Sequence, residues 1–285
     1  MSAQPALRSA NFLPNPPATL RGMGRIAVLI LEMAGRSYKL RFAGSYMGLL
    51  WSVLGPLCSA LVTATIFSFL MRGRMGASYA AIPYGVFYFV GFSIWGMISE
   101  VISRSTTTVV ENATLITKIS FPSAILPAVV VVTCLINYAV YLAIAVVLVL
   151  VHGVHFGSHM YLLPIYFLLG ALLSAGIGYA AAAIGVFVRD LTHAIPIVLN
   201  ILFFLSPISY SPDVLRQNAP GWVQALLLKW NPISQLIEGY RTSFIEVGAQ
   251  VDVGGLLYLS VMSLAIFVLG FISFHALKPL FADVL

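Results

Sequence analysis

The sequence has few charged residues. Only 8% of its 285 residues are Asp, Glu, Lys or Arg, whereas 60% are hydrophobic. Soluble domains carry about 25% charged residues, so this chain cannot cover a water-facing surface, and lipid must be much of its solvent. Cysteine is scarce too. Cys58 and Cys134 both fall inside apolar segments, where packing as small hydrophobic residues is favoured over a disulfide.

The sequence also lacks the motifs of nucleotide binding and catalysis. It contains no G-x-x-x-x-G-K-[ST] loop to cradle ATP phosphates, so the chain is not expected to hydrolyse nucleotide itself. No Ser/His/Asp arrangement or close carboxylate pair is present, and no catalytic residue is predicted. His152, His155 and His159 share one loop, but they have no acidic or thiol partner, which favours a solvated loop over a metal site. The scattered basic residues argue against nucleic acid as a partner.

Long apolar runs are what the sequence has in abundance. A membrane span needs about 20 such residues, and six runs qualify or come close: 48–71, 82–103, 125–151, 161–188, 194–210 and 253–276. The fifth run is short and holds Pro196 and Pro207. The sequence therefore predicts an all-α polytopic membrane protein with six transmembrane helices. Prolines interrupt the start of the chain before any signal-peptide pattern forms, so residues 1–24 are expected to be a flexible cytoplasmic tail.

The basic residues predict the orientation of these spans. If the amino terminus is inside, the cytoplasmic segments hold Arg8, Arg21, Arg25, Arg36, Lys39, Arg41, Arg104, Lys118, Arg189 and Lys278. The outer segments then hold Arg72, Arg74, Arg216, Lys229 and Arg241. Because positive charge accumulates in cytoplasmic loops, the split places both termini in the cytoplasm.

An amphipathic helix is predicted over residues 25–41. Its apolar residues recur with helical spacing at Ile26, Leu29, Ile30 and Met33. Its charged residues lie on the other side, at Arg25, Glu32, Arg36 and Lys39. A basic amphipathic helix just before a span is expected to lie flat on the cytoplasmic leaflet. It serves either as a juxtamembrane anchor or as a mobile element that helps gate an entrance.

A short cytoplasmic helix is predicted over residues 108–120. Thr108 and Glu111 fit a capping box at its start, and Pro122 discourages helix at Phe121. Leu115, Ile116 and Ile119 give it an apolar side. Such an exposed side needs a protein partner, unless the segment is a loop that rests on the bilayer.

The segment 206–248 is expected on the outer side. Prolines break its apolar runs, and the stretch from Trp222 to Trp230 is too short to cross a bilayer of about 30 Å. Ile233, Leu236, Ile237, Tyr240 and Phe244 repeat on one helical face, opposed by Glu238, Arg241 and Glu246. Two short helices that enter the membrane and return are predicted, which indicates a pore mouth or lid.

The polar residues near or within the spans favour structural roles. Glu100 and Arg104 are spaced i, i+4 near the inner boundary, which favours an interfacial ion pair over a proton relay. Asn137 and Asn200 are interpreted as interhelical hydrogen-bonding residues.

Several stretches, in register from about residue 36 to the end, resemble the membrane subunit of polysaccharide ABC exporters, especially the O-antigen type. The similar motifs are Leu40-Arg41-Phe42, Gly48-Leu49-Leu50-Trp51, Gly55-Pro56-Leu57, Glu111-Asn112-Ala113, Phe121-Pro122, Phe187-Val188-Arg189-Asp190, Phe203-Phe204-Leu205-Ser206-Pro207, Asn231-Pro232, Glu238-Gly239-Tyr240-Arg241 and Phe281-Ala282-Asp283. The chain departs from the family at Gly55, where Asn or Glu is frequent, and in its longer amino-terminal tail.

The resemblance implies a homodimer in the bacterial inner membrane that docks two separate ATPase subunits. No cofactor is expected on this chain, and ATP would bind the partner subunits. The helix over 108–120 would be the coupling helix, with Thr108, Glu111, Asn112, Leu115 and Lys118 at the ATPase contact. The segment 206–248 would be the re-entrant outer gate, with Pro207, Pro212, Trp222, Trp230, Pro232, Glu238 and Arg241.

The dimer is expected to enclose a channel for a lipid-linked polysaccharide. Sugars present hydroxyls and apolar C–H faces, so a tolerant track needs aromatic side chains. The candidates are Tyr46, Trp51, Tyr88, Trp95, Phe203, Phe204 and Tyr210, each of which could instead serve core packing or an interfacial belt. The alternatives are a capsule or teichoic-acid ABC permease, an ABC exporter of small amphiphiles, and an integral lipid-carrier glycosyltransferase, which would need acidic residues at the membrane surface.

Overall fold

The structure is a computed structural model that describes residues 20–41, 44–48, 50–70, 75–118, 121–248 and 250–285. Within these ranges the regular structure is helical, apart from one isolated antiparallel bridge between Phe156 and Ile245. The expected tail over 1–19 lies outside the described residues. Residues 20–24, also expected in that tail, instead begin the first helix, α1 (Leu20–Arg41).

Among the described residues, five helices are long and apolar enough to cross a membrane. They are α2 (Leu50–Leu70), α3 (Tyr84–Glu111), α5 (Ile125–Val151), α6 (Leu163–Phe187) with the 3-10 turn η2 (Met160–Leu162) before it, and α11 (Val253–Leu277). The remaining expected span, the fifth along the chain, corresponds to α7 (Leu191–Leu205), which has 15 residues and is about 22 Å long at 1.5 Å per residue. It ends before the expected limit at 210 because Pro207 disfavours a helical Ser206, which is extended.

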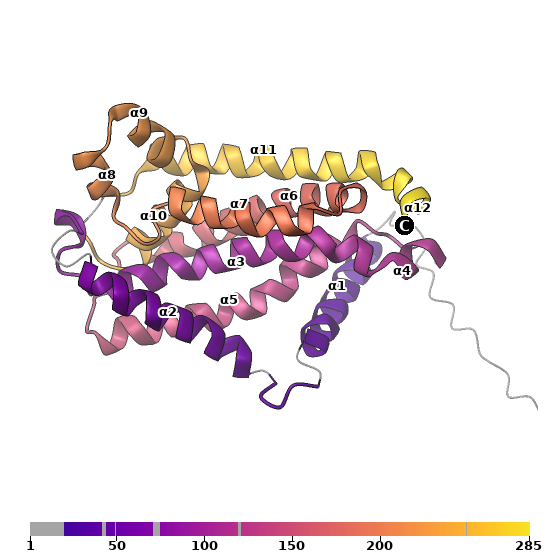
Figure 1. Cartoon of the computed structure of the whole chain (residues 1–285), viewed down its shortest axis with the longest axis horizontal. Helices are drawn as coiled ribbons and strands as arrows, with labels where there is room; N and C mark the ends of the chain where they lie inside the picture. The colour runs from indigo at the N-terminus through magenta and orange to yellow at the C-terminus, as the bar shows by residue number, and fades with distance from the viewer. Residues whose placement is uncertain (1–19, 42–43, 49, 71–74, 119–120, 249) are drawn as a thin grey trace, which may run out of the picture.

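Helix α3 is the centre of the bundle (Figure 1) and is buried along most of its length. It packs against α5, α6 and α7. It also continues past Ser103, where the span was expected to end, to Glu111. Its last turns stay close to α6 because Gly185 has no side chain: an added Cβ there would overlap the carbonyl oxygen of Thr106. Small residues permit such close contact between helices in membranes.

Helices α6 and α11 approach each other in the same way. An added Cβ at Gly270 would overlap the carbonyl oxygen of Gly176, and one at Gly176 would overlap the backbone at Phe267. The two helices therefore touch backbone to backbone. At one end of this pair, Phe274 and Phe281 pack with Tyr179 in a separate apolar cluster.

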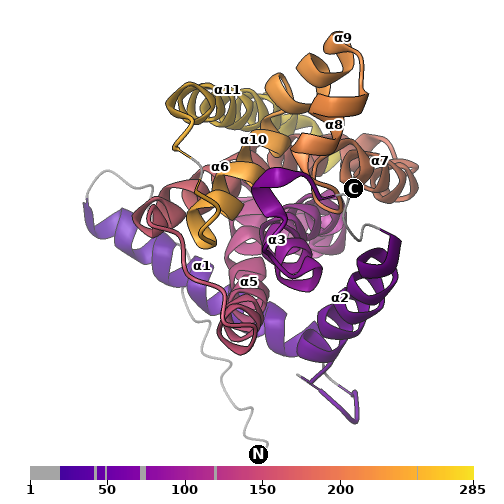
Figure 2. The ribbon, with the colours of Figure 1, turned by 90° about the vertical axis from the view of Figure 1, so that its left-hand side faces the viewer.

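Helix α1 crosses the other helices rather than running along them (Figure 2). Its predicted apolar face packs against Ile125 and Val129 of α5 through Ile26, Leu29, Ile30, Met33 and Ala34. The charged residues Arg25, Glu32, Arg36 and Lys39 are exposed, as predicted. Protein therefore covers the face that was expected to rest on lipid, while Val28 and Leu31 remain exposed beside it.

The short helices gather at opposite ends of the bundle (Figure 1). At one end lie α8 (Pro212–Asn218), α9 (Gly221–Gln224), the π-helical turn η3 (Ala225–Lys229) and α10 (Pro232–Phe244). At the other end lie α4 (Ala113–Lys118), the 3-10 turn η4 (Lys278–Leu280) and α12 (Phe281–Val284). The expected outer and cytoplasmic segments are thus separated by the length of the bundle.

Replacing Gly270 by valine is expected to destabilise the protein. The new side chain has no room against Gly176, so α6 and α11 must separate, at a cost of about 1–3 kcal/mol. The measurement is the melting temperature of the detergent-solubilised chain. Gly254→Ala in the same helix is the control, since a Cβ there meets only Asp252 Oδ1 at 3.4 Å. Equal melting temperatures for Gly270→Val and the parent would contradict the close contact.

Candidate functional site

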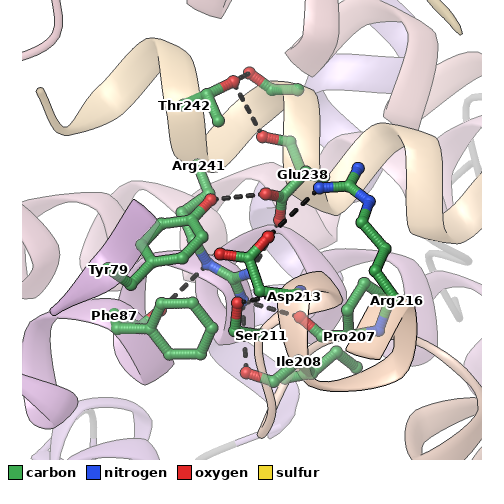
Figure 3. A network of polar contacts seen from close by, with 11 residues as sticks. Tyr79, Phe87, Pro207, Ile208, Ser211, Asp213, Arg216, Glu238, Arg241 and Thr242 are labelled. Carbon is green, nitrogen blue, oxygen red and sulfur yellow. Dashed lines mark hydrogen bonds and ion pairs between the residues drawn. The ribbon is translucent and has the colours of Figure 1, made fainter. Parts of the chain in front are cut away.

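Arg241 of α10 is fully buried at the centre of a polar network (Figure 3). Its Nε donates to the carbonyl oxygen of Phe87 at 3.2 Å, and its Nη1 donates to Glu238 Oε2 at 3.0 Å. The guanidinium also lies over the Phe87 ring, 3.8 Å from its centroid. Gly91 leaves the necessary space, because a Cβ there would overlap Nη2. The expectation that Arg241 lies on the polar side of α10 is wrong, since these partners satisfy its charge inside the core.

The same arginine holds the non-helical segment that follows α7. Its Nη2 donates to the carbonyl oxygens of Pro207 at 2.9 Å and Ile208 at 3.2 Å. The Tyr84 hydroxyl donates to the carbonyl oxygen of Ser209 at 2.8 Å. Buried backbone carbonyls that are not in a helix need such partners. Arg241 therefore fastens this segment to α3 and α10.

Residues of η1 (Ala77–Tyr79) attach to the same network. The Tyr79 hydroxyl donates to Glu238 Oε1, and the backbone N–H of Ser78 donates to Asp213 Oδ2 at 3.2 Å. Burial raises the pKa of the Tyr79 phenol, and the nearby Glu238 carboxylate raises it further, so the phenol remains a donor. Arg216 pairs with Asp213 at 3.2 Å on the surface. The network thus joins α3, η1, α8 and α10.

Helix α10 begins at a well-formed cap. The Asn231 side chain accepts hydrogen bonds from the N–H groups of Ile233 and Ser234, and Pro232 occupies the first turn. The predicted apolar face is confirmed: Ile233, Leu236, Ile237, Tyr240 and Phe244 are all buried. This face packs among α3, α6 and α11.

The chain leaves α10 at the same end of the bundle where α8 and α9 lie. Ile245 pairs with Phe156, which belongs to the loop between α5 and η2. The Glu246 carboxylate accepts hydrogen bonds from the N–H groups of Ser158 at 2.7 Å and Gly248 at 3.0 Å. These backbone donors lower the pKa of Glu246 below its usual range. The segment between α7 and α11 therefore enters and leaves the bundle at one end.

The cytoplasmic helix differs from its expected form. Thr108 is buried inside α3, so the predicted capping box is wrong. The helix breaks instead at Asn112, which ends α3, and the Asn112 side chain donates to the Thr108 carbonyl oxygen at 2.8 Å. α4 then runs to Lys118, and Ile119 lies outside the described residues. Glu111 is exposed and Leu115 half-buried, whereas Ile116 packs on the cluster around Phe281.

Glu100 is the centre of a second polar group, between α1, α3 and α5. Its carboxylate accepts hydrogen bonds from Arg41, from Arg104 at 3.3 Å, and from Asn137 Nδ2 at 2.8 Å to both oxygens. The predicted Glu100–Arg104 ion pair and the interhelical role of Asn137 are confirmed. Asn200 is exposed on α7.

The expected channel aromatics do not form one surface in the single chain. Tyr88 and Trp95 are buried, and Phe203 packs edge-on against Trp95 at 6.1 Å. Tyr46, Trp51 and Phe204 are exposed. The hydroxyl of the half-buried Tyr210 donates to the Phe204 carbonyl oxygen at 3.2 Å. Of the expected gate residues, Pro207 and Pro212 are buried, whereas Trp222 and Trp230 are exposed.

Comparison with known proteins places these features in a family. The family described as "ABC-2 type transporter" matches residues 28–245, which is most of the chain. The chain belongs to the ABC-2 type transporters. It is therefore a membrane transport subunit rather than an enzyme in itself.

Curated relatives of this ABC-2 chain cover most of its length. The O-antigen export system permease protein RfbA of Myxococcus xanthus is 31% identical, over 76% of this chain and 80% of the relative. A protein of the same name from Klebsiella pneumoniae is 25% identical, over 92% and 97%. The polysialic acid transport protein KpsM of Escherichia coli is 25% identical, over 82% and 88%.

Several residues of this ABC-2 chain were missed by reasoning from the sequence. Tyr79 and Phe87 surround Arg241, and Arg41 joins Glu100. These contacts link residues far apart in the sequence, and only the folded chain brings them together. By contrast, the Asn-Pro pair at Asn231 is typical of a helix start, and it could have located the beginning of α10.

Arg241→Gln is expected to destabilise the protein by about 3–5 kcal/mol, because it leaves the Glu238 carboxylate and three carbonyl oxygens without their cation. The measurement is the melting temperature in detergent. Arg216→Gln is the matched control: its side chain is 61% exposed, and loss of its surface pair costs about 1 kcal/mol or less. Similar melting temperatures for the two variants would contradict the central role of Arg241.

Proposed function

We propose that this chain is the channel-forming permease subunit of an ATP-driven exporter that moves a lipid-linked polysaccharide across the bacterial inner membrane. The observation that carries the proposal is the match, along nearly the whole chain, to relatives named as O-antigen export permeases. The relative named as a polysialic acid transport protein supports a polysaccharide cargo in general. A capsule permease is therefore the second candidate.

In this proposal two copies of the chain form a homodimer, and two ATPase subunits bind its cytoplasmic side. ATP binds those subunits, and this chain needs no cofactor. The exposed Glu111 at the end of α3 and the half-buried Leu115 within α4 support a docking role for that end. Ile116 of α4 packs on the cluster around Phe281. This contact supports a role in which movement of the ATPase subunits displaces α4 and, through it, the bundle.

The proposed topology has six spans: the five long helices and the shorter α7, which is the fifth span along the chain. Pro196 lies inside α7. Because α7 has only 15 residues and is shorter than the other spans, local thinning of the bilayer or snorkelling of flanking residues must accommodate it. Both termini are then cytoplasmic. The segment between α7 and α11 becomes the outer gate, which dips into the membrane from outside and returns.

The coupling role of α4 can be tested by charge reversal. Glu111→Arg combined with Leu115→Asp is expected to abolish co-purification of the ATPase, because it reverses the charge and removes the apolar contact at the proposed docking face. The measurement is ATPase recovered with the affinity-tagged permease. Gln217→Arg, on exposed α8, adds a charge at the other end and should leave recovery unchanged. Full ATPase recovery with a normally melting double variant would contradict the coupling role.

The topology can be tested by labelling introduced cysteines. In a chain whose native Cys58 and Cys134 are replaced by serine, Trp222→Cys and Gln250→Cys should both react with an impermeant maleimide applied from outside. Both positions are exposed and flank α10, so a returning segment keeps them on one side. Glu111→Cys should react only in inverted vesicles. Reaction of Trp222→Cys and Gln250→Cys from opposite sides would exclude a re-entrant gate.

A further inference from the structure

A cavity of about 750 Å³ lies inside the proposed outer gate. The elements α8, α9 and η3 form one side, and α10 with the start of α11 forms the other. Binding sites for small molecules have volumes of roughly 300–1,000 Å³. The cavity is complete within a single chain, and its aromatic lining is separate from the residues expected to line the channel.

The wall combines aromatic faces with hydrogen-bonding groups. Tyr79, Tyr166, Trp230 and Tyr258 contribute rings. Trp230 is 59% exposed, and it is held in place because the Tyr258 hydroxyl donates to its carbonyl oxygen at 2.7 Å. The polar residues of the wall include Gln224, Ser234, Gln235, Thr242 and Gln250. A pyranose ring offers the complementary pattern of apolar C–H faces and hydroxyl groups.

The charges in the wall balance one another. The basic residues Arg216 and Lys229 are matched by the acidic residues Glu238 and Asp252. Arg216 pairs with Asp213, and Glu238 is already bound to Arg241 and Tyr79. The wall therefore has no net charge, and Lys229, whose Nζ lies 5.8 Å from the centroid of the Trp230 ring, is the cation that an anionic ligand would meet. A neutral, hydroxyl-rich ligand fits this wall better than an anionic lipid headgroup.

Ser234 points independently to a ligand. It belongs to the wall of the cavity, its residue is 2% exposed, and its Oγ has no hydrogen-bond partner within the described part of the chain. A buried hydroxyl without a partner is costly. Two other polar groups of the wall already donate hydrogen bonds within the chain. Gln235 Nε2 donates to the Leu228 carbonyl oxygen at 2.7 Å, and the Thr242 hydroxyl donates to the Glu238 carbonyl oxygen at 2.9 Å.

We propose that this cavity binds a neutral saccharide unit of the exported glycan on the outer side of the membrane. The proposal rests on the function proposed above and adds a cargo site within each subunit. Trp230 supplies an aromatic face for the sugar ring, and Ser234 supplies a hydroxyl that hydrogen-bonds to it. A sugar in this position bridges η3 and α10, so it stabilises their contact when glycan is present.

The test uses the full chain with its ATPase partner in nanodiscs of phosphatidylethanolamine and phosphatidylglycerol. The probes are the methyl glycosides of mannose, galactose, rhamnose and N-acetylglucosamine, and the neutral oligosaccharides released by mild acid from the surface polysaccharide of the same cells. Saturation-transfer NMR measures binding. Inorganic phosphate and phosphoethanolamine are the competing arms for a phosphate or a lipid headgroup.

At least one saccharide probe is expected to bind, with affinity reduced about two- to tenfold by Ser234→Ala and by Trp230→Leu. Ser263→Ala is the matched control for the first variant, because it removes another buried hydroxyl that has no hydrogen-bond partner among the described residues and lies outside the cavity wall. Trp222→Leu is the control for the second, since Trp222 is exposed and outside the wall. Ser234→Ala should not lower the melting temperature, because its hydroxyl makes no hydrogen bond to the described residues that the variant could lose.

Surface display of the polysaccharide, measured in parallel, separates the two proposals. If cells need the chain for display and no saccharide probe binds, the cavity proposal is overturned and the proposed function stands. Equal affinities in Ser234→Ala, Trp230→Leu and their controls would also overturn it, as would displacement of the probes by phosphoethanolamine. If cells without the chain display the polysaccharide normally, both proposals fail.

Discussion

The arrangement of this protein depends on how it satisfies backbone that is buried but not helical. Between the end of α7 and the start of α8, residues 206–209 are buried in extended or turn conformations. Their carbonyl oxygens find donors in the Arg241 guanidinium and the Tyr84 hydroxyl. Without such donors these buried, non-helical carbonyl groups would carry the cost of unpaired polar atoms. The positions of α8 and α10 follow from that attachment, because α8 comes directly after the segment and α10 carries Arg241.

A second constraint is the closeness of the helices. In a bilayer no hydrophobic effect drives one apolar helix against another, so packing and hydrogen bonds must do so. Helix α6 meets this need with small residues that face both neighbours: Gly185 faces α3, and Gly176 faces α11. The resulting framework is tight enough to keep α10 packed among three long helices, even though α10 has only 13 residues.

The sequence predicts patterns that repeat locally, and it misses contacts between distant segments. The length of its apolar run located α5 at the same bounds as the structure, and periodicity identified the apolar faces of α1 and α10. It placed Arg241 on the polar side because charge normally faces water, whereas a carboxylate and carbonyl oxygens from three segments enclose it here. The end of α3 was missed for a related reason: contact with α6 buries Thr106 and Val109, and this tertiary packing outweighs the polar sequence.

Helix α3 has 28 residues, so it forms an uninterrupted rod of about 42 Å. Near one tip, the Phe87 carbonyl oxygen is bound to Arg241; midway, Glu100 is bound to the end of α1; at the other tip, Asn112 leads directly into α4. A rigid rod transmits displacement along its axis without the slack of an intervening loop. A displacement at one end of the bundle is therefore carried by α3 to the opposite end. Because Arg41 is bound to Glu100, the same displacement also acts on α1.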